Sequence, residues 1–153
     1  MSFRWFLATM ALSACAAPSP SPGPPTMDPG RLVPDFQAQF TQEAAAWNRG
    51  DLDTFMGDYA PGDLPTYMAG GHLLRGFDEI RNYYAPRFAP GARRDSLRYE
   101  EFQVRPLTDR YVLLTARYIL YHGGSTTASG PFTLLMERRP EGWKILHDHS
   151  SSD

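Results

Sequence analysis

Cysteine is nearly absent from this sequence, since its 153 residues contain one, Cys15. The chain from residue 31 onward therefore has no thiol for a disulfide framework or for cysteine catalysis. It also lacks a glycine-rich phosphate loop and a serine in a nucleophile elbow, which argues against two common kinds of active site. Basic residues are dispersed among acidic ones and the formal net charge is −2, so we expect no nucleic-acid partner.

The start of the chain has the layout of an export signal. Arg4 supplies a positive charge, residues 5–12 are uncharged and mostly apolar, and a Leu-Ser-Ala-Cys sequence ends at Cys15. The apolar run is too short and wrongly flanked for a transmembrane helix. Its ending resembles a bacterial lipobox, which implies a lipoprotein signal peptide in residues 1–14 and lipidation of Cys15. We therefore expect a lipid-anchored protein that faces the periplasm, with the outer membrane as its destination by analogy.

Ordinary secretion is the alternative, because Ala14-Cys15-Ala16 also fits a small-x-small cleavage site and would leave a soluble periplasmic protein. The stretch that follows is rich in Pro, Ser and Gly and cannot bury a core. We expect residues 15–30 to be the lipidated cysteine and an extended tether. Residues 31–153 are enough chain for one compact domain.

The domain divides into a helical first half and a strand-rich second half. Asp35 is the expected N-cap of a helix with apolar residues at helical spacing, and Gly50 is its expected stop. A second helix follows Asp51, and a third begins after Gly76 and ends or kinks at Pro86. The expected strands are 66–68 and 72–74, which form a hairpin, and then 96–107, 111–122, 132–138 and 143–150. This order predicts an α+β fold with the helices on one face of a sheet.

Three segments carry a resemblance to a known family: residues 46–51 (AWNRGD), 76–80 (GFDEI) and 142–150 (GWKILHDHS). In order and spacing they resemble the nuclear-transport-factor-2-like superfamily, and within it the SnoaL-like branch and the association domain of calmodulin-dependent kinase II. The resemblance implies a SnoaL-like domain in which a curved antiparallel sheet wraps around three N-terminal helices as a cone with one open pocket. It also implies a homodimer or larger ring formed through the outer face of the sheet. It does not define an activity, since this fold hosts enzymes, transport adaptors and oligomerisation hubs.

The sequence His147-Asp148-His149 in the last expected strand is the main candidate site. Because side chains alternate across a strand, Asp148 shares one face with Ser150, and the two histidines share the other. The resemblance slightly favours the Asp148 face for the pocket and the outer side for the histidines. A desolvated Asp148 would have its pKa raised towards neutrality, which suits a general base. The alternative is that Asp148 is hydrogen-bonded to its neighbours and only orders the end of the sheet.

The same two histidines could present their imidazoles to one metal ion, with His122, His72 or Glu101 as conceivable third ligands. Hydrogen bonds across the strands or a subunit interface account for such a pair more simply. The family that the chain resembles also performs chemistry without metals. We therefore expect no metal and no cofactor.

Aromatic side chains are a second indication of a pocket, because tyrosines give an apolar wall with hydroxyls that orient a ligand. The candidate pocket residues are Trp47, Tyr59, Tyr67, Tyr84, Tyr118, His147 and His149. Aromatic residues at helical or strand spacing are also typical of an ordinary core, so only part of this set is expected to contact a ligand. Arg75 and Arg117 are the cations expected to face inward, where either could pair with an anionic ligand or with Asp148.

Three hypotheses for the function follow. The favoured one is a membrane-anchored, dimeric protein that binds an unknown small molecule in its pocket without catalysis. The second is a cofactor-free isomerase, dehydratase or cyclase with Asp148 as general base and Tyr67 or Tyr118 orienting the substrate. The third is an oligomerisation module whose vestigial pocket is filled by Trp47 and the tyrosines.

Binding is favoured over catalysis because acid–base enzymes of this fold place a second polar group deep in the cone. The expected inward positions of the first helix are all apolar: Phe36, Phe40, Ala44 and Trp47. Glu43 is the nearest carboxylate and is expected on the flank of the helix. A single carboxylate makes a weak acid–base site.

Overall fold

The computed structural model describes residues 27–153. The predicted signal peptide, the lipidation site Cys15 and the tether up to residue 26 lie outside the described residues. Within the described range, no helix has both the length and the apolar character needed to cross a membrane.

The domain opens with three helices, α1 (Pro29–Arg49), α2 (Leu52–Met56) and α3 (Phe77–Phe88). Helix α1 begins earlier than expected, because its N-cap is Asp28, whose side chain accepts a 2.9 Å hydrogen bond from the backbone N–H of Gly30. Pro29 lies in the first turn, where its fixed φ and missing N–H are well tolerated. Pro34 lies inside the helix near its start and does not end it. The predicted cap at Asp35 was therefore wrong.

A tight corner joins α1 to α2, as expected. Gly50 adopts a left-handed conformation with φ of 82°, and its N–H donates to the carbonyl of Trp47 over 3.1 Å. Asp51 then caps α2 and accepts a 3.0 Å hydrogen bond from the backbone N–H of Thr54.

Six strands form one sheet in the order β2-β1-β6-β5-β4-β3. They are β1 (Thr66–Ala69), β2 (His72–Arg75), β3 (Ser96–Pro106), β4 (Tyr111–His122), β5 (Ser125–Arg139) and β6 (Gly142–Ser150). All neighbours are antiparallel except β1 and β6, which pair in parallel. Strand β5 starts seven residues before the expected 132–138, because Gly123-Gly124 forms a two-residue turn that lets His122 pair with Ser125.

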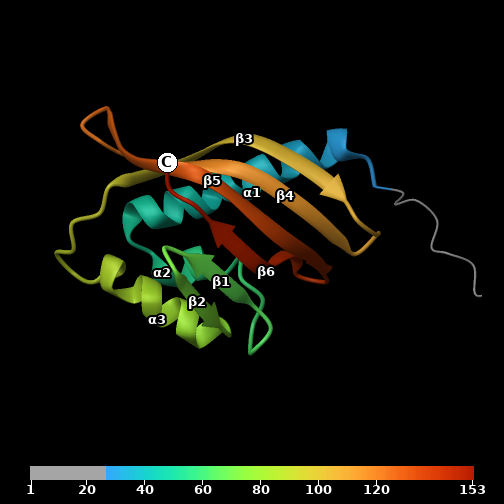
Figure 1. Cartoon of the computed structure of the whole chain (residues 1–153), viewed down its shortest axis with the longest axis horizontal. Helices are drawn as coiled ribbons and strands as arrows, with labels where there is room; N and C mark the ends of the chain where they lie inside the picture. The colour runs from blue at the N-terminus through green and yellow to red at the C-terminus, as the bar shows by residue number, and fades with distance from the viewer. Residues whose placement is uncertain (1–26) are drawn as a thin grey trace, which may run out of the picture.

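The helices cover one face of the sheet, which confirms the predicted α+β arrangement. In Figure 1, α1 runs along the long strands β3, β4 and β5, whereas α2 and α3 gather near the short strands β1 and β2. Phe36 and Phe40 of α1 are almost completely buried against the sheet, together with Leu114, Leu134 and Ile145 from its central strands. The curved sheet remains open and leaves room at one end of the cone.

A β-bulge in β3 contributes to this curvature. The register between β3 and β4 shifts after Glu100, and the next residue, Glu101, has a positive φ of 61°. Tyr99 and Phe102 consequently lie on the same face of the sheet, where both rings contact Phe40 at centroid distances of 5.3 and 5.8 Å. Strict alternation would have placed these two aromatic residues on opposite faces.

Candidate functional site

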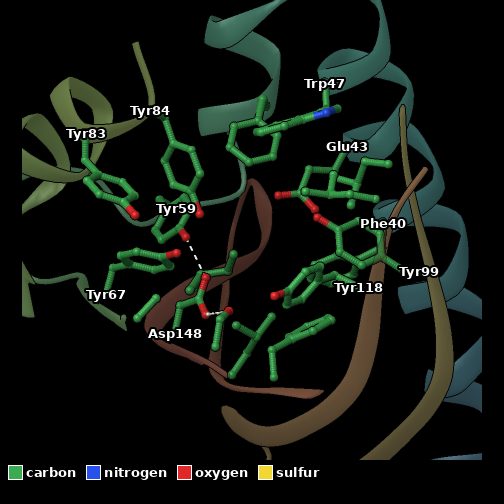
Figure 2. Close-up of a pocket in the computed structure, with 18 of the residues that line it drawn as sticks. Phe40, Glu43, Trp47, Tyr59, Tyr67, Tyr83, Tyr84, Tyr99, Tyr118 and Asp148 are labelled. Carbon is green, nitrogen blue, oxygen red and sulfur yellow. Dashed lines mark hydrogen bonds between the residues drawn. The ribbon is translucent and has the colours of Figure 1, made fainter. Parts of the chain in front are cut away.

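A cavity of about 290 Å³ lies between the helices and the concave face of the sheet. Two of its wall residues are acidic, Glu43 and Asp148, and one is basic, Arg87. Ten wall residues are aromatic: Phe40, Trp47, Phe55, Tyr59, Tyr67, Tyr83, Tyr84, Tyr99, Tyr118 and Phe132. Figure 2 shows their rings and hydroxyls surrounding the two carboxyl groups. The cavity is thus a mainly aromatic container with acidic groups inside it.

Asp148 of β6 is one of these acidic groups and is only 8% exposed. The hydroxyl of Tyr59 donates a 2.7 Å hydrogen bond to Oδ2, and the hydroxyl of Ser150 donates a 3.0 Å bond to Oδ1 (Figure 2). Burial raises the pKa of Asp148 from its ordinary value of 3.8 to about 6, against the lowering effect of these two donors. Asp148 is therefore a hydrogen-bonded carboxyl that gains or loses its proton close to neutral pH.

A β-bulge in β6 determines which side chains of this strand reach the cavity. Leu135 of β5 pairs with His147, whereas the next residue, Met136, pairs with Ile145, so β6 has one extra residue between them. Ile145 and Asp148 consequently both face the interior, although they are three positions apart and alternation would separate them.

Glu43 of α1 is the second carboxyl group, and it is 4% exposed. Its Oε2 is buried and has no hydrogen-bond partner. Burial raises the pKa of Glu43 well above its ordinary value, and the nearby carboxyls of Asp58 and Asp148 raise it further. The prediction that Glu43 lies on the flank of the helix was wrong.

The helical spacing contains the signal that would have located Glu43. Phe36, Phe40, Glu43 and Trp47 follow one another at intervals of four, three and four residues, which is the spacing of a single helix face. All four side chains are buried. The prediction placed Glu43 beside this buried face of the helix, whereas its helical spacing places it on the face.

Tyrosine hydroxyls surround these carboxyls. Tyr59 donates a hydrogen bond to Asp148, and Tyr67, Tyr84 and Tyr99 also line the cavity. Burial raises the pKa values of Tyr59, Tyr67, Tyr84 and Tyr99 above the usual range for a phenol. These phenols are therefore neutral hydrogen-bonding groups.

The segment that follows β6 forms part of the cavity mouth. Ser151 and Ser152 line the cavity, and the hydroxyl of Ser152 lies 3.3 Å from that of Tyr118. Asp153 lies 2.5 Å from Arg117, and its backbone N–H donates to the carbonyl of Ser129 over 3.0 Å. The predicted inward orientation of Arg117 is wrong, because this cation binds Asp153 and lies 3.5 Å from Glu101, outside the cavity wall.

The structure gathers most of the predicted site residues around one cavity. Trp47, Tyr59, Tyr67, Tyr84, Tyr118 and Asp148 all line it. The two predicted histidines do not. Nδ1 of His147 lies 2.7 Å from the hydroxyl of Thr66 in β1, and His149 is exposed to solvent. The bulge in β6 directs Asp148 inward and leaves both histidines outside, which corrects their assignment to the pocket.

Other wall residues were not anticipated. Tyr83 and Arg87 come from α3, and Tyr99 is directed into the cavity by the bulge in β3. Arg75, the other cation expected inside, is exposed on β2 and does not line the cavity. Within residues 27–153, no group of three or more His, Cys, Asp or Glu side chains is arranged to hold a metal ion.

A cone formed by a curved sheet and three N-terminal helices, with an aromatic cavity at its open end, defines a class of pocket-bearing α+β domains. The chain belongs to the SnoaL-like domain family, which matches residues 37–152. This match confirms the resemblance seen in the sequence. No curated protein matches the chain.

Solved structures show the same fold. A nuclear-transport-factor-2-like protein of unknown function from Shewanella oneidensis is 28% identical, with a TM-score of 0.68, and the match covers 78% of this chain and 98% of the other. A candidate dehydratase of this superfamily from Streptomyces avermitilis is 20% identical, with a TM-score of 0.64 and coverage of 82% and 99%. A candidate calmodulin-dependent kinase II association domain from Xanthomonas campestris is also 20% identical, with a TM-score of 0.62 and coverage of 86% and 92%.

Proposed function

We propose that this protein binds a small, partly apolar molecule in the aromatic cavity. The observation that carries the proposal is the cavity itself, about 290 Å³ of space enclosed by ten aromatic residues with two buried carboxyls. Ligand sites are typically concave, mostly apolar and supplied with a few convergent polar groups, and this cavity has each of these properties. A cavity of about 150 Å³ holds benzene, so twice that volume suits one ring with a short polar side chain.

This cavity argues against a pocket that is only vestigial. Trp47 and the tyrosines were the residues expected to fill it, and they form its walls instead. Trp47 packs against Phe55 and Phe88 at centroid distances of 5.4 and 5.3 Å, and its indole N–H donates to the carbonyl of Asp95 over 2.8 Å. The ring is held at the wall by these contacts and leaves the interior open.

Binding is tested with a panel of small aromatic compounds, measured as a rise in the melting temperature. Ala69 lines the cavity, so Ala69→Trp should fill it and abolish the rise. Ala128 is exposed on β5, and Ala128→Trp is the matched control that should respond like the wild type. If no compound raises the melting temperature, or if Ala69→Trp responds as the wild type does, the proposal is wrong.

Acid–base catalysis is a second candidate, and the observation that favours it is Asp148. Its pKa of about 6 makes it largely ionised yet still basic at neutral pH, and Tyr59 holds it in place. Glu43 supplies the second carboxyl group whose expected absence weighed against catalysis. A cavity with two carboxyls in different environments has the groups that proton transfer requires.

Nitrobenzisoxazole tests this candidate, since its ring opens to a coloured phenolate when a base removes one C–H proton. We expect the opening rate to increase with pH around the Asp148 pKa of about 6 and to be lost in Asp148→Asn. Glu141 lies in an exposed turn, so Glu141→Gln should leave the rate unchanged. A rate that is equal in wild type and Asp148→Asn excludes Asp148 as the base.

Export, lipidation and dimerisation are parts of the same proposal, and their support comes from different features. The sequence ending at Cys15 supports a lipid anchor. Labelling with a fatty-acid analogue in a bacterial host should mark the wild type and not Cys15→Ser. Two half-buried leucines on the outer face of the sheet, Leu113 and Leu135, support a dimer.

A further inference from the structure

The two carboxyl groups give the cavity strong hydrogen-bond acceptors. The phenolic proton of Tyr59 is already donated to Asp148, and Ser150 donates to the other oxygen of the same carboxyl. Oε2 of Glu43 has no hydrogen-bond partner. An ionised carboxylate only accepts hydrogen bonds, so a ligand that fits these two groups brings its own donors.

Glu43 provides the strongest unsatisfied acceptor. Its Oε2 is buried and has no partner, and Figure 2 shows the carboxyl directed from α1 into the cavity. A buried polar atom without a hydrogen bond destabilises the fold by an amount comparable to its desolvation. A group that donates to this atom would relieve that cost.

The charges around the cavity are also one-sided. Glu43 and Asp148 lie inside, and Arg87 is the one basic side chain among the described wall residues. Arg87 is exposed at the rim, where it donates to the carbonyl of Tyr83 over 3.0 Å and stacks 4.6 Å above that ring. No cation in the described wall therefore neutralises the two buried carboxyls.

The walls suit a cation as well. Aromatic faces carry negative potential and attract ammonium groups, most strongly Trp and Tyr. Trp47, Tyr59 and Tyr84 bring such rings close to the two carboxyls. An anionic ligand would meet like charges here, and a purely apolar one would leave Glu43 unsatisfied.

We propose that the ligand of this cavity is a small organic cation, a protonated amine attached to a compact apolar body. The inference deepens the proposed binding function and rests on it. The ammonium donates to Oε2 of Glu43 and offsets part of the negative charge of the two carboxylates, while the apolar body packs against the aromatic wall. Burial raises the pKa of both carboxyls in the unliganded protein, and a bound cation favours their ionised forms.

Three probes with the same phenyl body and different charge test the inference: phenethylammonium, phenethyl alcohol and phenylacetate. Each is titrated into the protein and followed by calorimetry near neutral pH. We expect phenethylammonium to bind at least about tenfold more tightly than the alcohol. A hydrogen bond between charged groups changes a dissociation constant by about that factor. Phenylacetate should bind most weakly of the three.

Glu43→Gln and Asp148→Asn locate the effect. Each should weaken phenethylammonium binding by about tenfold or more and change the affinity for the alcohol by less than about threefold. Glu141→Gln is the control, because this exposed carboxyl carries the same charge far from the cavity. Either cavity variant alone suffices if the other fails to fold.

The outcomes separate this inference from the proposed function. If the alcohol or phenylacetate binds as tightly as the cation, the cation inference is overturned and the binding function stands. If phenethylammonium binds equally well to Ala69→Trp, its site is elsewhere and the inference fails. If none of the three probes binds at millimolar concentration, both the inference and the proposed function are overturned.

Discussion

Glu43 and Asp148 are costly residues for the fold, because both carboxyls are buried and burial raises both pKa values. Asp148 recovers part of that cost through the hydroxyls of Tyr59 and Ser150. Oε2 of Glu43 recovers none. Natural proteins retain such destabilising groups mainly where function requires them. The effect of each carboxyl on the free energy of unfolding can be measured separately.

Glu43→Met should stabilise the protein. Methionine has a similar length and no polar atom, so the variant removes a buried orphan oxygen, an effect of about 1–3 kcal/mol on the free energy of unfolding. Urea unfolding of the wild type, Glu43→Met and the exposed control Glu141→Met measures it. A destabilised Glu43→Met would mean that Glu43 contributes to the fold and not only to a ligand.

The stability of the protein should fall as the pH rises from about 4 to 6. The folded pKa of Asp148 is raised from 3.8 to about 6, so in this range the folded state holds a proton that the unfolded state has lost. The stabilisation from this proton is complete below the pKa that Asp148 has in the unfolded state. It declines by roughly 3 kcal/mol as the pH rises through the pKa that Asp148 has in the folded state.

The variant Asp148→Asn isolates the contribution of Asp148 to this pH dependence. The other buried groups with shifted pKa values, such as Glu43 and His147, are present in both proteins. Denaturant unfolding at several pH values should show a smaller decline in the variant. Parallel pH profiles in the two proteins would show that the Asp148 carboxyl is not desolvated.

At the scale of secondary-structure elements, bulges decide which residues of a strand face the cavity. The sequence predicted helices and strands in the right order, because hydrophobic spacing and turn residues are local signals. It did not predict the extra residues in β3 and β6, which direct Tyr99 and Asp148 into the cavity. A bulge depends on how two strands pair, and that information lies outside either strand.

The segment after β6 passes directly over Gly130 in β5. The backbone N–H of Ser151 donates to the carbonyl of Pro131 over 3.0 Å, and a Cβ at Gly130 would overlap the carbonyl oxygen of Ser151. Gly130→Ala should displace residues 151–153 from the cavity mouth and destabilise the protein by about 1–3 kcal/mol.

Hydrogen exchange measures this displacement. The amides of Ser151 and Asp153 should exchange faster in Gly130→Ala than in the wild type, because their hydrogen bonds to β5 are broken. Ala128→Ser, an exposed substitution on the same strand, is the control and should exchange normally. Unchanged protection in Gly130→Ala would show that the segment can shift without loss of its contacts.

At the scale of the whole molecule, the outer face of the sheet carries partly exposed apolar side chains. Leu113 of β4 and Leu135 of β5 pair with each other on the face away from α1, and both are only half-buried. Apolar side chains on an exposed sheet face are typical of an interface.

We therefore expect a dimer in sedimentation equilibrium at micromolar concentration. Leu135→Glu should make the protein monomeric, because a carboxylate would be desolvated at the centre of that face. Leu107 is 45% exposed in a turn outside the sheet, and Leu107→Glu is the matched control. A monomeric wild type, or a dimer that tolerates Leu135→Glu, would contradict this arrangement.

The sequence by itself determined the order of the elements, the aromatic composition of the cavity and its family, because periodicity, turn residues and short motifs are encoded locally. Only the tertiary structure decided which polar groups meet inside. Tyr59 and Asp148 are 89 positions apart, and the bridge between Tyr59 and Ile145 together with the bulge in β6 brings their side chains to 2.7 Å. Glu43 lay on the apolar face of its helix from the start, yet only the packed sheet opposite shows that it faces a cavity. Local patterns specify elements, whereas long-range pairing specifies the site that they form together.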